Sequence, residues 1–155
     1  MNIGIIVHSQ TGNTYSVVQK LQEKLLASGQ AVGLERLIPV DEKQAEAKKV
    51  QLKNMPDISS YDALIISGPV RGFSISPVVA AFLSNISPIQ SKKVAVMVTQ
   101  LFPFPILGGN HAIAQMKRIC ESKGAVVCGT GIVNWSSKKR EAMITDVVER
   151  LSSSF

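Results

Sequence analysis

The sequence predicts a three-layer α/β/α fold in which helices cover both faces of a mostly parallel sheet. Short, nearly continuous apolar runs rich in β-branched residues are typical of parallel strands that are buried on both faces. Segments whose apolar residues recur every three or four positions separate these runs and are typical of amphipathic helices. Such an alternation predicts right-handed βαβ units. The expected strands are 3–7, 31–37, 63–67, 94–98 and 125–133.

The expected helices follow the strands in order. Their apolar residues span 17–25, 78–86, 113–120 and 143–151, and a shorter helix is expected at 43–50. Ser76 followed by Pro77 predicts a helix start, because serine caps a helix and proline fits its first position. Gly29 and Gly124 are placed where two of the helices are expected to end.

Composition restricts the class of protein. With 155 residues, of which 45% are hydrophobic, the chain is expected to form one domain over residues 1–155. It has no apolar run of about 20 residues and no basic leader at its start, so we expect a cytoplasmic protein without a membrane span. Cys120 and Cys128 match neither a redox pair nor a zinc site and are expected to be reduced thiols.

The net charge of +6 comes from 17 Lys and Arg against 11 Asp and Glu, and it favours anionic ligands or acidic partners. Basic residues do not form a stripe interleaved with aromatics, so no nucleic-acid partner is expected. In an open parallel sheet, ligands bind beyond the carboxyl ends of the strands. The candidate loops are therefore 9–14, 68–76 and 99–110.

The first of these loops is rich in hydroxyl and amide groups around Gly12. A Walker loop would need lysine where Asn13 stands, and a dinucleotide-binding loop would need three glycines instead of one. Uncharged donors at the positive end of a helix suit a phosphate monoester. The alternative interpretation is an ordinary helix cap, since Ser, Thr and Asn are common at helix starts.

The first loop also resembles a known family. Ser9-Gln10-Thr11-Gly12-Asn13-Thr14 is similar to the phosphate-loop signature of the flavodoxins, T/S-x-T-G-x-T. The resemblance covers the whole chain, through the five-strand alternation, the run YDALIISGPV and the length of short-chain flavodoxins. It implies a flavodoxin-like five-stranded parallel sheet of order 2-1-3-4-5 that binds FMN. The phosphate would lie on the first loop and the isoalloxazine ring between the second and the third.

A flavin ring needs apolar side chains and backbone donors around it. The resemblance assigns it Pro69, Val70, Arg71, Gly72, Phe73 and Ser74 in the second loop, and Gln100, Leu101, Phe102, Phe104, Gly108, Gly109 and Asn110 in the third. The three phenylalanines have alternative interpretations, Phe73 as part of the core and the other two as loop anchors. Gly72 is expected to permit a positive φ, and Asn110 is expected to cap the following helix.

Two basic features depart from the acidic surroundings that many flavodoxins give their cofactor. Arg71 is expected to raise the potential at which the flavin becomes an anion, unless its side chain points into solvent. Lys138, Lys139 and Arg140 are expected in the first turn of the last helix. They either help to dock an acidic partner or form a solvated face.

We find no nucleophile, carboxylate pair or metal cluster, so we expect no catalytic residue and no metal, and the chemistry must belong to the cofactor. His8 and His111 are expected to be structural or solvated. The chain is expected to be an electron carrier between redox partner proteins, as a monomer or small homo-oligomer. Alternatives are an FMN-dependent NAD(P)H:quinone oxidoreductase, which is usually longer, and an interaction scaffold without FMN.

Overall fold

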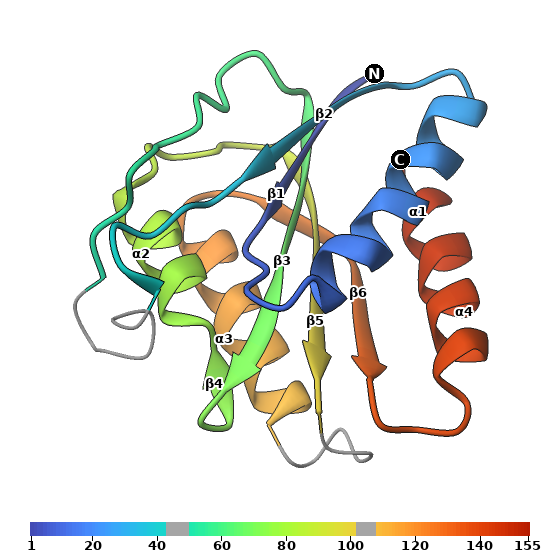
Figure 1. Cartoon of the computed structure of the whole chain (residues 1–155). Coiled ribbons are helices and arrows are strands. Elements are labelled where there is room, and N and C mark those ends of the chain that lie inside the picture. The colour runs from blue at the N-terminus through green and yellow to red at the C-terminus, as the bar shows by residue number, and fades with distance from the viewer. Residues whose placement is uncertain (43–49, 102–107) are drawn as a thin grey trace.

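Parallel strands form the sheet at the centre of the molecule (Figure 1). The computed structural model describes residues 1–42, 50–101 and 108–155, and within them five parallel strands have the order β2-β1-β3-β5-β6. They are β1 (Asn2–Val7), β2 (Ala31–Arg36), β3 (Ala63–Arg71), β5 (Lys93–Gln100) and β6 (Val126–Asn134). The predicted order 2-1-3-4-5 is confirmed, since β5 and β6 are the fourth and fifth parallel strands. The short β4 (Ser74–Ile75), which was not predicted, pairs antiparallel with the end of β3.

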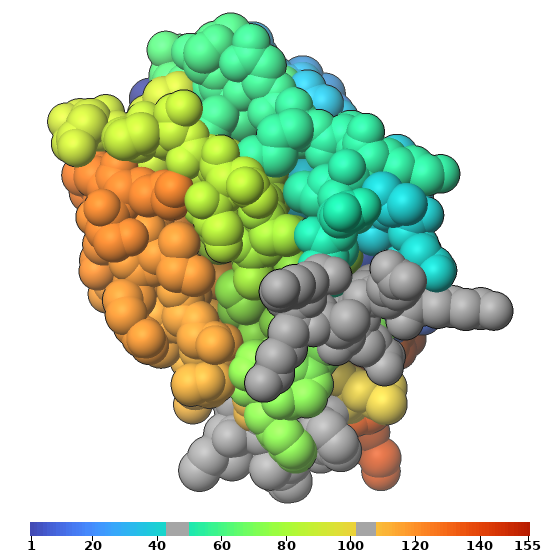
Figure 2. Space-filling model, turned by 90° about the vertical axis from the view of Figure 1, so that its left-hand side faces the viewer, coloured from blue at the N-terminus to red at the C-terminus, as the bar shows by residue number. Residues whose placement is uncertain are grey.

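Helices cover both faces of the sheet (Figure 1). One layer consists of α1 (Asn13–Ala27) and α4 (Arg140–Ser152). The other consists of α2 (Pro77–Asn85) and α3 (Gly109–Ser122), which lie side by side on the face shown in Figure 2, in yellow-green and orange. The four longer predicted helices are confirmed, whereas the short helix expected at 43–50 falls almost wholly on residues outside the described part.

The predicted helix boundaries have a local chemical cause. The Ser76 hydroxyl caps α2 by accepting a hydrogen bond of 3.2 Å from the backbone N–H of Val78. Gly29 and Gly124 follow α1 and α3 with φ of 89° and 91°, which glycine adopts without steric cost. None of the described helices is both long and apolar enough to span a bilayer.

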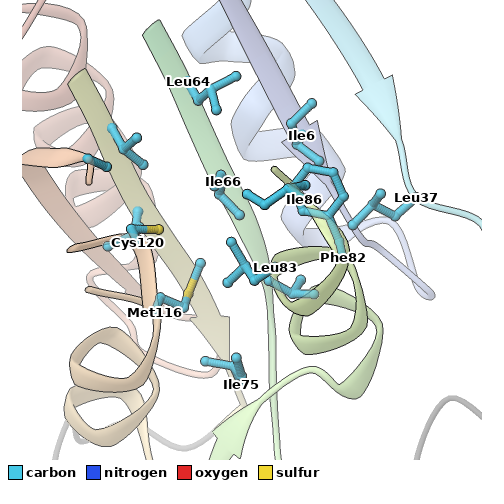
Figure 3. Close-up of a cluster of buried hydrophobic side chains, with 14 of the residues drawn as sticks. Ile6, Leu37, Leu64, Ile66, Ile75, Phe82, Leu83, Ile86, Met116 and Cys120 are labelled. Carbon is cyan, nitrogen blue, oxygen red and sulfur yellow. The ribbon is translucent and has the colours of Figure 1, made fainter. Parts of the chain in front are cut away.

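The sheet separates two apolar cores. Successive side chains of a strand point to opposite faces, so Ile5 packs beneath α1 and α4 whereas Ile6 packs beneath α2 and α3. Figure 3 shows the second core, where Phe82 of α2 and Met116 of α3 meet the sheet. Cys120 lies in this core, and its burial raises the pKa of the thiol to about 11, so it stays protonated.

Tyr61 fixes the edge of the sheet where β1 and β2 pair. Its ring lies across Gly4 and Gly33, which are directly paired in the register. A Cβ on Gly4 would lie 2.4 Å from the ring, and one on Gly33 would lie 2.2 Å from the hydroxyl oxygen. That hydroxyl donates a hydrogen bond of 3.0 Å to Glu35. Two glycines therefore make room for one aromatic side chain that holds the two strands together.

Candidate functional site

Four loops meet at the carboxyl edge of the sheet, after β1, β3, β5 and β6, and border a cavity of about 180 Å³. The lining residues are Ser9, Gln10, Thr11, Asn13, Thr14, Pro69, Val70, Arg71, Thr99, Gln100, Leu101 and Trp135. All of them except Thr99 and Trp135 belong to the site predicted from the sequence. The structure thus brings the first loop together with parts of the second and third.

Larger cavities occur among the described residues, of about 330, 470 and 490 Å³. Each includes residues of segment 50–59 or of α2, and none of these three is lined by the first loop. Part of their surface lies on the face shown in Figure 2. We place the candidate site at the smaller cavity, because among these four cavities it is the one where polar groups from several strand ends converge at a helix N-terminus.

Ser9 organises the first loop. Its hydroxyl oxygen accepts hydrogen bonds from the backbone N–H groups of Gly12, at 3.1 Å, and Tyr15, at 3.2 Å. A serine hydroxyl has two acceptor lone pairs and one proton, so its O–H remains a donor toward a further acceptor. Ser9 is buried, which restricts that acceptor to a group inside the loop or the cavity.

The loop also opens the start of α1 toward the cavity. Gly12 is the N-cap residue of α1 with a φ of 93°, and no side chain caps the helix from that position. The first turn contains no acidic residue. Backbone N–H groups at a helix start carry partial positive charge and favour an anion. Part of the alternative interpretation holds, since the Ser9 hydroxyl caps the N–H of Tyr15 in the first turn, but the N-cap residue itself, Gly12, supplies no side-chain acceptor.

Two arginines hold the first loop from opposite sides. Arg36, at the end of β2, donates a hydrogen bond of 2.7 Å to the carbonyl of Ser9, and its guanidinium lies 4.9 Å from the ring centroid of Tyr15. Arg71 donates a hydrogen bond of 2.5 Å to the side-chain oxygen of Gln10. The loop sequence contains no charge, yet the fold gives it two cations. Sequence reasoning missed Arg36, although the order 2-1-3 places the end of the second strand beside the first.

The second loop is a β-hairpin instead of an irregular loop. Val70 pairs with Ile75 and Arg71 with Ser74, which leaves a two-residue turn. Gly72 and Phe73 have φ of 53° and 64°, as a type I′ turn requires. The positive φ expected at Gly72 is confirmed. Phe73 adopts the same region at a cost of about 1 kcal/mol or more.

Phe73 is not a core residue. Its side chain is 55% exposed, so the alternative interpretation as a core residue is wrong. Neither Phe73 nor its neighbours Gly72 and Ser74 line the cavity. Their contact with a cofactor stays a prediction.

The third loop packs against the second. A Cβ on Gly108 would lie 2.8 Å from the Cα of Phe73 and 2.9 Å from Val70, and one on Gly109 would lie 2.7 Å from Gln100. These glycines thus permit close contact within the protein. Asn110 lies inside α3, whose N-cap is Gly108, so the predicted cap at Asn110 is wrong.

Two predicted residues of this loop, Phe102 and Phe104, fall outside the described residues.

Sequence reasoning also missed Trp135. It follows β6, lines the cavity and donates its backbone N–H to the carbonyl of Gln100 at 2.7 Å. The Arg140 guanidinium stacks 4.7 Å from the Trp135 ring centroid. The available signal was its place directly after the last strand, where ligand loops occur.

The helix α4 begins at Arg140, so Lys138 and Lys139 precede it instead of lying in its first turn. That part of the prediction is corrected. These two lysines are exposed on the loop that joins β6 to α4.

His8 lies directly after β1, next to the first loop, and contacts residues of two other segments. Its Nδ1 lies 2.7 Å from the hydroxyl oxygen of Ser76, and its Nε2 lies 3.6 Å from a carboxylate oxygen of Glu42. Burial lowers the pKa of His8 despite the opposing effect of Glu42, and the charges of Arg71 and Arg36 lower it further. The imidazole is therefore neutral at neutral pH, and His8 links the end of β1 to the start of α2.

The residues present fit a flavin mononucleotide. The start of α1 and the Ser9 hydroxyl offer uncharged donors that would suit a phosphate, and that they hold one stays a prediction. The buried Nε of Arg71 has no hydrogen-bond partner among the described residues, so it is a donor beside the cavity that an acceptor of a ligand can satisfy. Leu101 and Trp135 add apolar surface for a flat aromatic ring.

Known structures share this fold over the full chain. A flavodoxin of Megasphaera elsdenii has 23% identity and a TM-score of 0.70, with 97% of this chain and 98% of that chain covered. Flavodoxin 2 from Bacillus cereus has 18% identity and a TM-score of 0.69, with both chains covered completely. A flavodoxin of Streptococcus pneumonia TIGR4 has 16% identity and a TM-score of 0.68, again with complete coverage. At these identities the likeness establishes the fold.

The sequence itself identifies the family. No curated protein matches the chain significantly. Residues 4–103, well over half of the chain, match the family model described as a flavodoxin domain. These residues include the first two loops of the cavity and the end of β5. The chain therefore belongs to the flavodoxin family of FMN-binding redox proteins.

Proposed function

We propose that this protein carries single electrons between redox partner proteins. The observation that supports a carrier is the open edge of the cavity: Leu101 lines it and is 69% exposed. A cofactor held there has a route to the surface that a partner can approach. A nicotinamide-dependent reductase would need a second pocket for its substrate, and reductases of this fold are usually longer than 155 residues, which favours the carrier.

The proposal gives separate roles to the residues of the site. When bound, FMN supplies the electron chemistry, by accepting and releasing electrons one at a time. The N–H groups at the start of α1 and the hydroxyl of Ser9 hold the phosphate. Arg71 supplies a positive charge that favours the gain of an electron. Leu101 and Trp135 shield the ring from water.

We further propose that the protein is cytoplasmic. We also propose that its partners are acidic, on the basis of its net charge of +6 and of the cations near the cavity. Typical electron carriers of this family are acidic and dock on basic partners. Because this chain is basic, we expect its partner to be acidic.

The test is to purify the protein, identify any released flavin, and follow oxidation of NADH and NADPH with and without a quinone. A carrier releases FMN, passes through two one-electron steps on stepwise reduction, and does not oxidise either nucleotide without a partner reductase. Steady turnover with a quinone alone would overturn the proposal in favour of the oxidoreductase. A colourless protein that leaves the fluorescence of added FMN unchanged would overturn both.

A further inference from the structure

The carboxyl edge of the sheet carries an unbalanced charge. The loops around the cavity span 9–14, 68–76, 99–110 and 134–140. Their sequences contain Arg71, Lys138, Lys139 and Arg140 but no aspartate or glutamate. The nearest acidic residue along the chain, Glu141, lies 3.7 Å from Arg140 and 3.6 Å from Lys20, so it offsets only part of this charge.

Some cations elsewhere on the surface are neutralised by ion pairs. Lys24 pairs with Glu149 at 2.7 Å, and Arg150 pairs with Asp146 at 2.8 Å. By contrast, the cation of Arg71 contacts the neutral side chain of Gln10. Glu42, which follows β2 and lies 3.6 Å from His8, offsets part of this charge from the other side. The loops that line the cavity still carry more cations than anions, and this excess creates a local field that attracts an acidic surface.

The lysines are presented on a loop with fixed geometry. Trp135 is bonded to Gln100 through its backbone, and the Ser136 hydroxyl donates to the carbonyl of Leu101. The backbone N–H of Lys139 donates to the hydroxyl of Ser137 at 3.1 Å. A loop held in this way loses little conformational freedom when a partner binds, which lowers the entropic cost of association.

Exposed apolar side chains accompany these cations. Leu101 is 69% exposed, and Phe73 is 55% exposed at the tip of a turn that forces it to a φ of 64°. Gly108 packs against Phe73, which links the tip of this turn to the third loop. Strained conformations and exposed apolar groups persist at functional surfaces. An apolar centre with charged residues around it is the usual anatomy of a protein interface.

We propose that Arg71, Phe73, Leu101, Lys138 and Lys139 form a docking face for an acidic redox protein. The inference rests on the proposed carrier function, for which it names the surface and the chemistry of the partner. The lysines and Arg71 steer and orient the acidic partner, and Leu101 and Phe73 make the central contact. One electron then passes between the bound cofactor and the redox centre of the partner, and no atom is transferred.

Binding is tested without electron transfer. The oxidised, FMN-loaded protein is titrated by calorimetry with a ferric acidic b-type cytochrome at about 20 and about 200 mM salt. We expect the dissociation constant to rise at least about tenfold with salt, because exposed charges are screened. Lys138→Glu/Lys139→Glu should weaken binding at low salt by about tenfold or more. The matched control, Lys93→Glu/Arg118→Glu, makes the same change in net charge on other exposed parts of the surface and should change binding less than twofold.

Phe73→Ser separates the apolar contribution from the charges. It should weaken binding several-fold and leave the salt dependence in place. Equal effects of the two double variants would overturn the docking face, because net charge alone would then explain the attraction. Binding that does not respond to salt, or a preference for a basic cytochrome c, would overturn it as well.

Electron transfer gives an independent readout. The reduced protein is mixed with the same acidic cytochrome, and reduction of its ferric haem is followed by stopped flow. We expect a second-order rate constant that falls at least about tenfold between the two salt concentrations and in the lysine double variant. If the FMN-loaded protein binds the acidic cytochrome as expected but reduces no one-electron acceptor, the carrier function fails while the docking face stands. Rapid reduction with equal rates for the wild type and the lysine variant overturns the docking face and leaves the carrier function intact.

Discussion

The hydroxyl oxygens of Thr14 and Thr99 lie 2.7 Å apart and share a hydrogen bond, although 85 residues separate them in the chain. Both side chains are buried. Thr14 lies in the first turn of α1, and Thr99 lies near the end of β5. This bond ties the start of α1, directly after the first loop, to the end of the strand that leads into the third loop.

Replacing Thr99 with valine removes that bond while keeping the shape of the side chain. The hydroxyl of Thr14 is then buried without this partner, so we expect the free energy of unfolding to fall by about 1 to 2 kcal/mol. Urea unfolding of the apoprotein measures the change. Thr14→Val/Thr99→Val should lose less than the sum of the two single variants. Strict additivity would show that the two hydroxyls are not coupled.

Arg71 is expected to set the potential of the cofactor. Arg71→Ala should lower the more negative of the two one-electron midpoint potentials by on the order of 100 mV, because a positive charge near the reduced flavin is lost. A spectroscopic redox titration measures this. Arg71→Lys keeps the charge and Gln10→Ala keeps the guanidinium without its hydrogen bond, so both should stay closer to the wild type. A midpoint potential unchanged in Arg71→Ala would contradict this role.

His8 is expected to make stability depend on pH. Its pKa in the folded protein lies below the ordinary value of 6.5, so the unfolded chain binds a proton more readily. The contribution of His8 to the free energy of unfolding should therefore be complete above pH 6.5. It should fall as the pH drops from 6.5 toward the pKa of His8 in the folded protein. Urea unfolding between pH 5 and 8 tests this, and His8→Asn should flatten the dependence. His111→Asn, which removes the other histidine, is the control and should leave the dependence in place.

Gly33 is expected to tolerate no side chain. Gly33→Ala would place a Cβ 2.2 Å from the hydroxyl oxygen of Tyr61, and the strain should lower the free energy of unfolding by about 1 to 3 kcal/mol. Thermal or urea unfolding measures the loss. Adding Tyr61→Phe to this variant removes the clashing oxygen and should recover part of the loss. No recovery would mean that the strain lies elsewhere in the sheet.

Trp135 offers a direct report on cofactor binding. It is the one tryptophan of the sequence, and it lines the cavity. Titration of the apoprotein with FMN should therefore quench the tryptophan emission in parallel with the flavin emission. Trp135→Phe removes the first signal and leaves the second available to measure affinity. Flavin binding without any change in tryptophan emission would place the cofactor away from this cavity.

The sequence predicted the layers and the strand order, because continuous apolar runs and helical spacing are local properties of the chain. It did not predict β4. The pairing of Arg71 with Ser74 depends on a turn in which Phe73 takes a positive φ, a conformation that no pattern of apolar residues indicates. Tertiary packing of Gly108 against that turn overrides the local preference of phenylalanine.

Part of the candidate site could be predicted from the sequence and part could not. The first loop is continuous in sequence, so a motif could find it. Trp135 and Arg36 reach the same place from distant parts of the chain, through strand ends that only the folded sheet makes neighbours. The misplacement of Asn110 and Lys138 relative to their helices has another cause: helix starts capped by glycine or lysine lack the side-chain signal on which boundary prediction depends.

The contact of Gly108 with Val70 and Phe73 has a consequence for how the site responds to its redox state. A backbone rearrangement of the hairpin, such as a peptide flip at Gly72, would change the surface on which the third loop rests. We expect Gly108 to adjust together with such a change. Structures of the oxidised and reduced protein would then differ at Gly72 and at Gly108 together.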